Sequence, residues 1–309
     1  MNKIIVVGSS NTDMVVRCSR LPKPGETVLG GEFIRAHGGK GANQAVAAAR
    51  LGGQVSFVCR VGNDSFGQEA TEAYKQEGID TSNIIVDLSG ASGIALIVVD
   101  EHGENYIAVA SGVNLHLCPA DVDFLATAFS TGDVLLLQLE IPIATVERAA
   151  EIAKEKGAIV ILDPAPAPSD GLPDSLFPQL DYILPNEHEA AALIGKNNDL
   201  HSLAQALLQK GTRNVIITAG EKGCVLANQN RIETFPAFPV NAADSTAAGD
   251  AFAGGLAVAL AEGIGLRNAI EFAQKAAALS VTKIGAQPSL PRREEIVDPN
   301  SLEASVSFT

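Results

Sequence analysis

The sequence lacks any closely spaced pair of cysteines. Cys18, Cys59, Cys118 and Cys224 are scattered over the 309 residues and form no C-x-x-C motif. That motif is typical of zinc sites and redox-active disulfides, and the five histidines show no ligand spacing either. The scattered cysteines favour free thiols over disulfides, which indicates a reducing compartment and hence the cytoplasm.

Positive charge and long apolar runs are also scarce. The chain carries 22 lysines and arginines against 36 aspartates and glutamates, for a formal net charge of −14. Nucleic acids and anionic membranes need a positive surface, so neither is expected as a partner. No apolar run approaches the ~18 residues of a membrane span, and the run at the N-terminus stops at Gly8, too early for a secretory signal. With 46% hydrophobic residues, the composition is that of a globular protein.

Short runs rich in valine and isoleucine alternate with alanine-rich stretches along most of the chain. Apolar runs typical of strands begin at residues 3, 54, 133, 158, 182 and 214, and stretches typical of helices span 42–53, 66–78 and 144–157. Repeated alternation of this kind predicts an α/β fold with three layers, in which a mostly parallel central sheet carries helices on both faces.

Two segments, 12–36 and 93–112, break this alternation because they predict strands without helices. The second is expected to be a hairpin with its turn at 100–104. We expect the two to form a small β-sheet that stands off an α/β core made of 1–11, 37–92 and 113–309, as a lid, a dimer interface or both. Two edge hairpins packed on the core are the alternative.

Polar residues gather where strands of the predicted sheet end, and in open parallel sheets ligands bind beyond those ends. Asn11 and Asp13 follow the first strand, two residues apart, and would face the same side of an extended chain. An amide beside a carboxylate suits the hydroxyls of a polyol, although an Asx turn explains the same pair. Glu140 closes the run at 133–140.

A glycine-rich stretch, HGGKGANQAVAAA at 37–49, precedes the next helix. Its spacing is neither that of a P-loop nor G-x-G-x-x-G, so by itself it favours a tight turn before a capped helix over a ligand loop. Asn43 lies in the first turn of that helix, where its amide could hydrogen-bond a hydroxyl-rich ligand.

Two further strand ends carry weaker signals. Asn186 and Glu189, in PNEHE, lie three residues apart on a first helical turn and could reach a phosphate-bound Mg²⁺ or its waters. A helix cap explains this pair equally well. Thr218 and Gly220, in TAGEKG, lie on a loop whose backbone could line a nucleotide.

The stretch DSTAAGDAFAGG at 244–255 predicts the start of a helix. There the backbone amides of Ala247, Ala248 and Gly249 would lack partners, and the small side chains leave room for a phosphoryl group. Asp250 would repel that anion, unless it accepts the proton of a hydroxyl that attacks phosphorus. We expect the helix start to keep Asp250 ionised.

Two motifs together, GGKGANQAVAAARLG at 38–52 and DSTAAGDAFAGG, resemble those of the ribokinase-like sugar kinases, also called the phosphofructokinase B family. The resemblance extends from Gly8 to about Pro291, and Ala247 stands where the family frequently has glycine. It implies the family's fold, with the small sheet as a lid and homodimer interface. It also implies ATP-dependent phosphorylation of a sugar's primary hydroxyl, with D-ribose to ribose 5-phosphate as the expected reaction.

The resemblance further implies roles for individual residues. Asp250 would be the catalytic base, with the amides of Ala247, Ala248 and Gly249 as its anion hole. The residues implied to hold the sugar are Asn11, Asp13, Gly39, Lys40, Asn43 and Glu140. Those implied around ATP and its Mg²⁺ are Asn186, Glu189, Thr218, Gly220, Gly223, Gly249 and Gln274. An activating K⁺ would be enclosed by oxygens of Asp244, Thr246, Ser280, Lys283, Gly285 and Ser289.

Three alternatives compete with this interpretation. The nearest is another substrate of the same family, such as deoxyribose, fructose or a nucleoside. A non-catalytic sugar-binding protein on the same fold is disfavoured by the intact Asp250 and its small neighbours. A dinucleotide-dependent dehydrogenase is disfavoured because GSSNTD follows the first strand in place of a glycine fingerprint.

Overall fold

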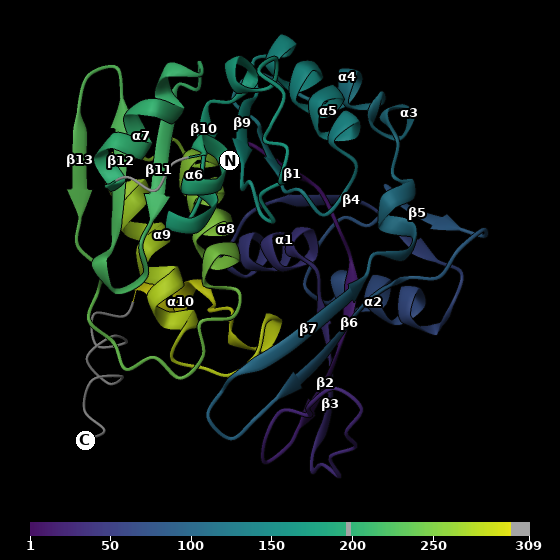
Figure 1. Cartoon of the computed structure of the whole chain (residues 1–309). Coiled ribbons are helices and arrows are strands. Elements are labelled where there is room, and N and C mark those ends of the chain that lie inside the picture. Colours follow the sequence, from purple (N-terminus) through teal and green to yellow (C-terminus); the bar gives the residue numbers. More distant parts are fainter. Residues whose placement is uncertain (196–198, 298–309) are drawn as a thin grey trace.

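The computed structural model describes residues 1–195 and 199–297. It contains two sheets, one of nine strands in the order β13-β12-β11-β10-β9-β8-β1-β4-β5 and one of four in the order β3-β2-β6-β7. Figure 1 shows helices on both sides of the larger sheet and the smaller sheet projecting below it. This confirms the predicted α/β architecture with a second small sheet.

The larger sheet is parallel from β5 to β11 and ends in an antiparallel hairpin, β12 and β13. The sequence analysis missed β5, β12 and β13, because these strands do not alternate with long helices. The strands are β1 (Ile4–Val7), β4 (Val55–Gly62), β5 (Ile84–Asp87), β8 (Val134–Leu137), β9 (Ile159–Leu162), β10 (Tyr182–Ile183), β11 (Asn214–Thr218), β12 (Cys224–Asn228) and β13 (Ile232–Phe235).

Side chains alternate across the large sheet and build one apolar cluster on each face. Ile4 and Val6 of β1 join the first cluster, whereas Ile5 and Val7 join the second. The first cluster includes α1 (Lys40–Arg50), α2 (Ser65–Gln76), α8 (Ala248–Ala261), α9 (Leu266–Ser280) and α10 (Arg293–Val297). The second includes α3 (Pro119–Val122), α4 (Leu125–Ala128), α5 (Ile143–Glu155), α6 (Glu187–Ile194) and α7 (Leu200–Gln209).

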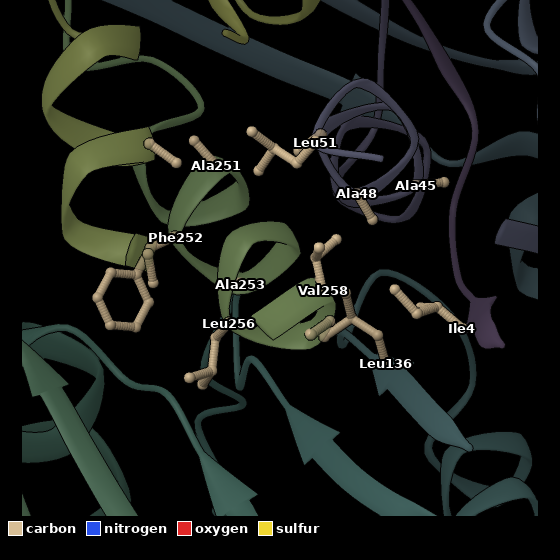
Figure 2. Packing of buried hydrophobic residues seen from close by; sticks show 14 of the residues in the cluster. Ile4, Ala45, Ala48, Leu51, Leu136, Ala251, Phe252, Ala253, Leu256 and Val258 are labelled. Atoms are coloured by element: carbon tan, nitrogen blue, oxygen red, sulfur yellow. The ribbon is translucent and has the colours of Figure 1, made fainter. Parts of the chain in front are cut away.

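Helices α1 and α8 cross in direct contact because their facing residues are small. Figure 2 shows Ala48 of α1, and Leu51 directly after α1, opposite Ala251 and Val258 of α8. A Cβ built on Gly254 would lie 2.7 Å from the Ala47 Cβ and 2.9 Å from the Ala48 nitrogen. No larger residue fits at Gly254 unless the helices separate. The crossing therefore fixes the N-terminus of α8 against the first turns of α1.

The smaller sheet combines the two segments that the sequence predicted as strands. It contains β2 (Asn11–Arg17), β3 (Phe33–Gly38), β6 (Gly93–Val99) and β7 (Asn105–Ala110), with β2 parallel to β6 and the other pairs antiparallel. The turn between β6 and β7 lies at 100–104 as predicted, and the Asp100 N–H donates to Glu104 O at 3.0 Å. All six residues of β7 are exposed.

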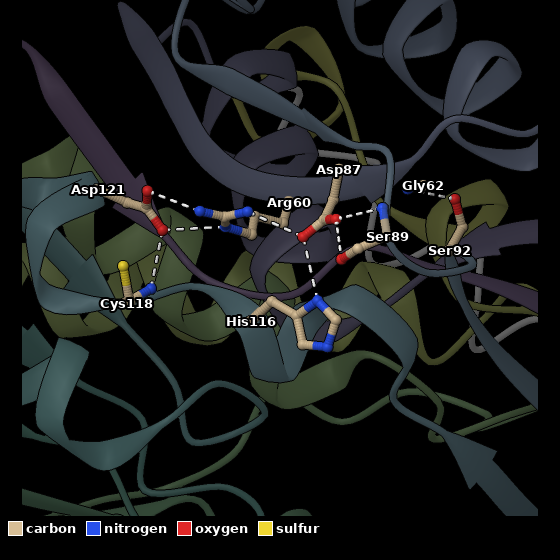
Figure 3. A network of polar contacts seen from close by, with 8 residues as sticks. All are labelled: Arg60, Gly62, Asp87, Ser89, Ser92, His116, Cys118 and Asp121. Atoms are coloured by element: carbon tan, nitrogen blue, oxygen red, sulfur yellow. Dashed lines mark hydrogen bonds and ion pairs between the residues drawn. The ribbon is translucent and has the colours of Figure 1, made fainter.

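A network of ion pairs anchors the segment that follows β7, the last strand of the smaller sheet (Figure 3). Arg60 of β4 lies 2.8 Å from Asp87 and 2.9 Å from Asp121. Asp87 in turn lies 3.1 Å from His116 Nδ1, in the 3₁₀ helix η1 (Gly112–His116). The network therefore holds η1 against the β4–β5 edge of the large sheet.

The remaining expectations about the chain as a whole concern its thiols and its apolar runs. All four cysteines are free, with Cys59 and Cys224 buried and the other two partly exposed. Among the residues of the described ranges, no helix combines the length and the apolar character needed to cross a bilayer. The polar tail from Asp298 lies outside those ranges.

Candidate active site

The glycine-rich stretch at the N-terminus of α1 meets the carboxyl ends of β1 and β8. The Lys40 N–H donates to Glu140 Oε2 at 2.9 Å, and the Ser9 hydroxyl donates to the same oxygen. A Cβ on Gly41 would lie 2.5 Å from the Ser9 nitrogen, and Gly39, with a φ of 88°, turns the chain into the helix. The stretch is therefore a tight turn that also brings Lys40 to Glu140.

Asn11 and Asp13 lie in the extended strand β2, so their side chains face the same side, as their spacing predicted. The strand replaces the Asx turn that was the alternative for this pair. The Asp13 carboxylate lies over β3, where a Cβ on Gly38 would come 2.3 Å from Asp13 Oδ2. The smaller sheet thus presents an amide and a carboxylate beside the turn that leads into α1.

Asn114 of η1 fixes the direction of the Asn11 amide. The Ser10 N–H donates to Asn114 Oδ1 at 2.9 Å, so Asn114 Nδ2 donates to Ser10 O at 3.1 Å and to Asn11 Oδ1 at 2.8 Å. Asn11 therefore keeps its own Nδ2 donor for a ligand. The sequence analysis missed Asn114, which lies 103 residues from Asn11 along the chain and belongs to no motif.

Asp250 lies in the first turn of α8, whose start at Ala248 agrees with the predicted helix start. Ala247, in the left-handed region with a φ of 60°, turns the chain into the helix. The Ala248 N–H donates to Ser245 O at 3.2 Å. Within residues 1–195 and 199–297, the amides of Gly249 and Asp250 have no hydrogen-bond acceptor. These two amides and their aligned helix can hold an anion.

The Asp250 carboxylate is buried and is held by two amides of α1. Asn43 Nδ2 donates to its Oδ2 at 2.9 Å, and Gln44 Nε2 donates to its Oδ1 at 3.0 Å. Asn43 Oδ1 is buried without a partner among the described residues, so it can accept a hydrogen bond from a ligand hydroxyl. The sequence analysis missed Gln44, because only the crossing of α1 and α8 brings it to Asp250.

Burial raises the pKa of Asp250, although Lys40 and the amides of Asn43 and Gln44 favour its charged form. The helix start is expected to keep Asp250 ionised, and burial opposes that expectation by disfavouring the charged form. A raised pKa makes the carboxylate a stronger base at the pH where it is still ionised.

Lys40 is the cation around which the acids of the site gather. Burial lowers its pKa, but Asp250, Asp163, Glu140 and Glu189 together outweigh that effect and raise it. Lys40 is therefore charged and can neutralise part of an anionic ligand.

The predicted nucleotide residues lie at the ends of β10 and β11. Asn186 and Glu189 form the capping box of α6, as the helix-cap alternative supposed, with bonds of 2.9 and 2.8 Å. Asn186 also pairs with Thr218 in a parallel bridge, which puts the two strand ends side by side. Gly220, with a φ of 54°, begins the 3₁₀ turn η3 (Gly220–Lys222).

Gly223 and Gln274 contact the same segment, 235–237. A Cβ on Gly223 would lie 1.9 Å from Phe235 O, and Gln274 Nε2 donates to Phe235 O and Pro236 O at 3.3 Å each. The segment after β13 therefore joins the loop at the end of β11 to helix α9.

The residues predicted to enclose a monovalent cation lie on two loops that Asp244 ties together. Its Oδ1 accepts from the Thr246 hydroxyl at 2.6 Å, and its Oδ2 accepts from the Gly285 N–H at 2.8 Å. The Lys283 N–H donates to Ser280 O at 3.1 Å, and Ser280 is buried, as is Ser289. Burial raises the pKa of Asp244, but the bonds from Thr246 and Gly285 outweigh it and lower that pKa.

No group of three or more His, Cys, Asp and Glu side chains in the part of the chain that the structure describes is arranged to hold a metal ion.

Comparison with known proteins gives a consistent result. The family model described as pfkB family carbohydrate kinase matches residues 1–293. A ribokinase of Haemophilus influenzae is 44% identical over 299 residues, which cover 96% of this chain and 97% of that protein. A crystal structure of ribokinase from Thermotoga maritima is similar with a TM-score of 0.88 and 42% identity, over 96% and 98% of the two chains. A structure of Arabidopsis thaliana ribokinase, complexed with ribose and ATP, has a TM-score of 0.87 and 31% identity over the whole of both chains.

Asp13 provides a test of the site's electrostatics. Burial, with the charges of Glu140 and Asp250, raises its pKa from 3.8 to about 6. Because the folded pKa lies above the unfolded one, ionised Asp13 lowers the free energy of unfolding progressively between pH 4 and 6 and fully above pH 6. Asp13→Asn should therefore raise that free energy by up to about 3 kcal/mol at pH 8, and by about half as much at pH 5.

Urea unfolding at the two pH values measures the difference, with exposed Asp170→Asn as the control variant. If Asp13→Asn is no more stable than the native protein at pH 8, the raised pKa of Asp13 is contradicted.

Proposed function

The chain belongs to the pfkB family of carbohydrate kinases, and we propose that it transfers the γ-phosphoryl group of ATP to the primary hydroxyl of D-ribose, giving ribose 5-phosphate. The observation that carries the assignment of the chemistry is the first turn of α8. It combines a buried carboxylate, Asp250, with free backbone amides at Gly249 and Asp250 itself.

Asp250 is the base in this proposal. The ribose hydroxyl approaches its carboxylate, gives up its proton and attacks the γ-phosphorus as the bond to the leaving ADP breaks. The amides at the start of α8 hold the oxygens of the phosphoryl group in flight, and the charge of Lys40 offsets the negative charge that gathers there. The Ala248 amide is partly engaged by Ser245, so Gly249 is the better placed member of the predicted anion hole.

The sugar lies between the smaller sheet and α1. Asn11 Nδ2 and Asn43 Oδ1 offer a donor and an acceptor, which suits a pair of ribose hydroxyls. Asp13 and Glu140 accept from further hydroxyls, and Gly39 with Lys40 lines the turn beneath them. Burial of these groups supports a small sugar that displaces water from the site.

ATP lies along the ends of β10 and β11. Thr218, Gly220 and Gly223 line its path toward Gln274, and Gly249 receives the γ-phosphate. The Mg²⁺ that accompanies ATP supplies charge neutralisation of the phosphates when bound. Asn186 and Glu189 offer oxygen ligands of the kind that Mg²⁺ prefers.

Asp250→Asn tests the base. The variant keeps the shape of the side chain but cannot accept the proton, so kcat should fall by ~10²–10⁴-fold while ribose still binds. A coupled ADP-release assay measures kcat, and calorimetric titration with ribose measures binding. Exposed Asp170→Asn is the control, and an Asp250→Asn enzyme that keeps more than about a tenth of native turnover would contradict the proposal.

The same assay over a panel of pentoses, hexoses and nucleosides tests the substrate, and a higher kcat/KM for deoxyribose or a nucleoside than for ribose would reassign it.

The loops joined by Asp244 form the proposed K⁺ site. Asp244 and Ser289 offer side-chain oxygens, and the carbonyls offered come from Thr246, Ser280, Lys283 and Gly285. Because α8 begins two residues after Thr246, a bound K⁺ would order the start of that helix and raise the rate without touching substrate.

Activity should therefore be several-fold higher in K⁺ than in Na⁺ of the same ionic strength, and Asp244→Ala should remove that difference. The coupled assay in matched chloride salts measures both. Equal native rates in the two salts would argue against the site.

We further propose a homodimer formed through the smaller sheet, which then also closes over the sugar. Support comes from the exposed apolar side chains of β6 and β7, half or more of each in contact with solvent: Leu96, Tyr106, Ile107 and Val109. A cytoplasmic location is proposed with it, because free thiols and a need for ATP fit a reducing compartment.

Ile107→Asp with Val109→Asp would put two charges on one face of β7, and the double variant should elute as a monomer. Light scattering after size exclusion measures the mass. Leu88→Asp, on an exposed apolar residue outside the smaller sheet, is the control. A native protein that is already monomeric at micromolar concentration would refute the dimer.

A further inference from the structure

Two buried carboxylates share the amide of one side chain, Gln44 of α1. Its Nε2 donates to Asp250 Oδ1 at 3.0 Å and to Asp163 Oδ2 at 2.8 Å. Asp163 directly follows β9, and all three residues are buried. Two carboxylates buried together are costly, and the Gln44 amide, together with the charge of Lys40, offsets part of that cost.

The orientation of the Gln44 amide is settled by its partners. Nε2 carries two hydrogens, one for each carboxylate, and Oε1 accepts from Gln138 Nε2 at 2.5 Å. A flipped amide would turn Oε1 toward the oxygens of Asp163 and Asp250 and leave Gln138 facing a second donor. Gln138 directly follows β8, so Gln44 is anchored to two adjacent strand ends of the large sheet.

Both oxygens of Asp250 are thus tied to α1, one through Gln44 and the other through Asn43. Of the two, only Gln44 continues to the sheet through its further bonds to Asp163 and Gln138. Asn43 ends in an Oδ1 without a partner among the described residues. Gln44 therefore fixes the position of the Asp250 carboxylate relative to the large sheet.

We propose that Gln44 is a positioning residue for phosphoryl transfer, which holds the Asp250 carboxylate in its reactive direction and stabilises its charged form, with Asp163 and Gln138 acting through it. This inference rests on the proposed function, in which Asp250 is the base. Gln44 touches neither substrate in this scheme.

Gln44 and the charged groups around Asp250 together set the pKa of that carboxylate. Lys40 of α1 favours the ionised form, whereas Glu140 after β8 disfavours it. Ionised Asp250 in turn raises the pKa of Asp163 after β9 and of Asp13 of β2. A hydrogen bond from Gln44 also favours the ionised form. Removal of that bond moves the pKa of Asp250 upward, so the acidic limb of the kcat/KM profile moves to higher pH.

Gln44→Met keeps the length of the side chain and removes its donor and acceptor. We expect kcat at pH 7 to fall by about 10- to 100-fold, as for loss of a hydrogen bond to a charged group. The acidic limb of the kcat/KM profile should move to higher pH by about one unit. The KM for ribose should change by less than about threefold. Gln179→Met, on a half-buried glutamine of η2 (Phe177–Gln179), is the control for the substitution itself.

Gln138→Leu is the second variant, because it leaves both carboxylates with their Gln44 donor and is expected to fold even where Gln44→Met does not. Its acidic limb should move in the same direction by a smaller amount. If the acidic limb of the kcat/KM profile lies at the native pH in every variant that folds, the inference is overturned. Asp250→Asn that remains active would instead refute the proposed function, so the two failures are distinguishable.

Discussion

The close crossing of α1 and α8 is the contact on which the site depends. Gly254 and the alanines opposite it let the two backbones approach until a single added methyl group would clash. At that separation, the first turn of α1 places Asn43 and Gln44 against the first turn of α8 and its Asp250. The small residues of both motifs therefore have a packing role that precedes any contact with a ligand.

Charge is concentrated where these elements meet. Four carboxylates, those of Asp250, Asp163, Glu140 and Glu189, act on the single cation Lys40, in a chain whose net charge is already −14. Desolvation raises the pKa of Asp13, Asp163 and Asp250, so folding keeps acids in an environment that disfavours their ionisation. Such destabilised groups are typical of sites where protons are transferred, and the rest of the core must offset their cost.

The smaller sheet is connected to this site through η1. Asp87, paired with Arg60, holds His116 of η1 on the large sheet, and Asn114 of η1 holds Asn11 at the start of β2. The segment that anchors the smaller sheet therefore also sets the direction of the Asn11 amide.

The sequence by itself determined the α/β class, the second sheet and the helix start at Asp250, because period, turn residues and small-residue motifs are local signals. Its motifs also identified the family. It did not reveal β5, β12 and β13, or the partners Gln44, Asp163, Gln138 and Asn114. These residues come from distant parts of the chain and stand in no fixed spacing. Only the packing of α1 on α8 and at the ends of β8 and β9, and of η1 beside β4 and β6, brings them together. The raised pKa of Asp250 was decided in the same way, since desolvation depends on what surrounds a carboxylate and not on its neighbours in sequence.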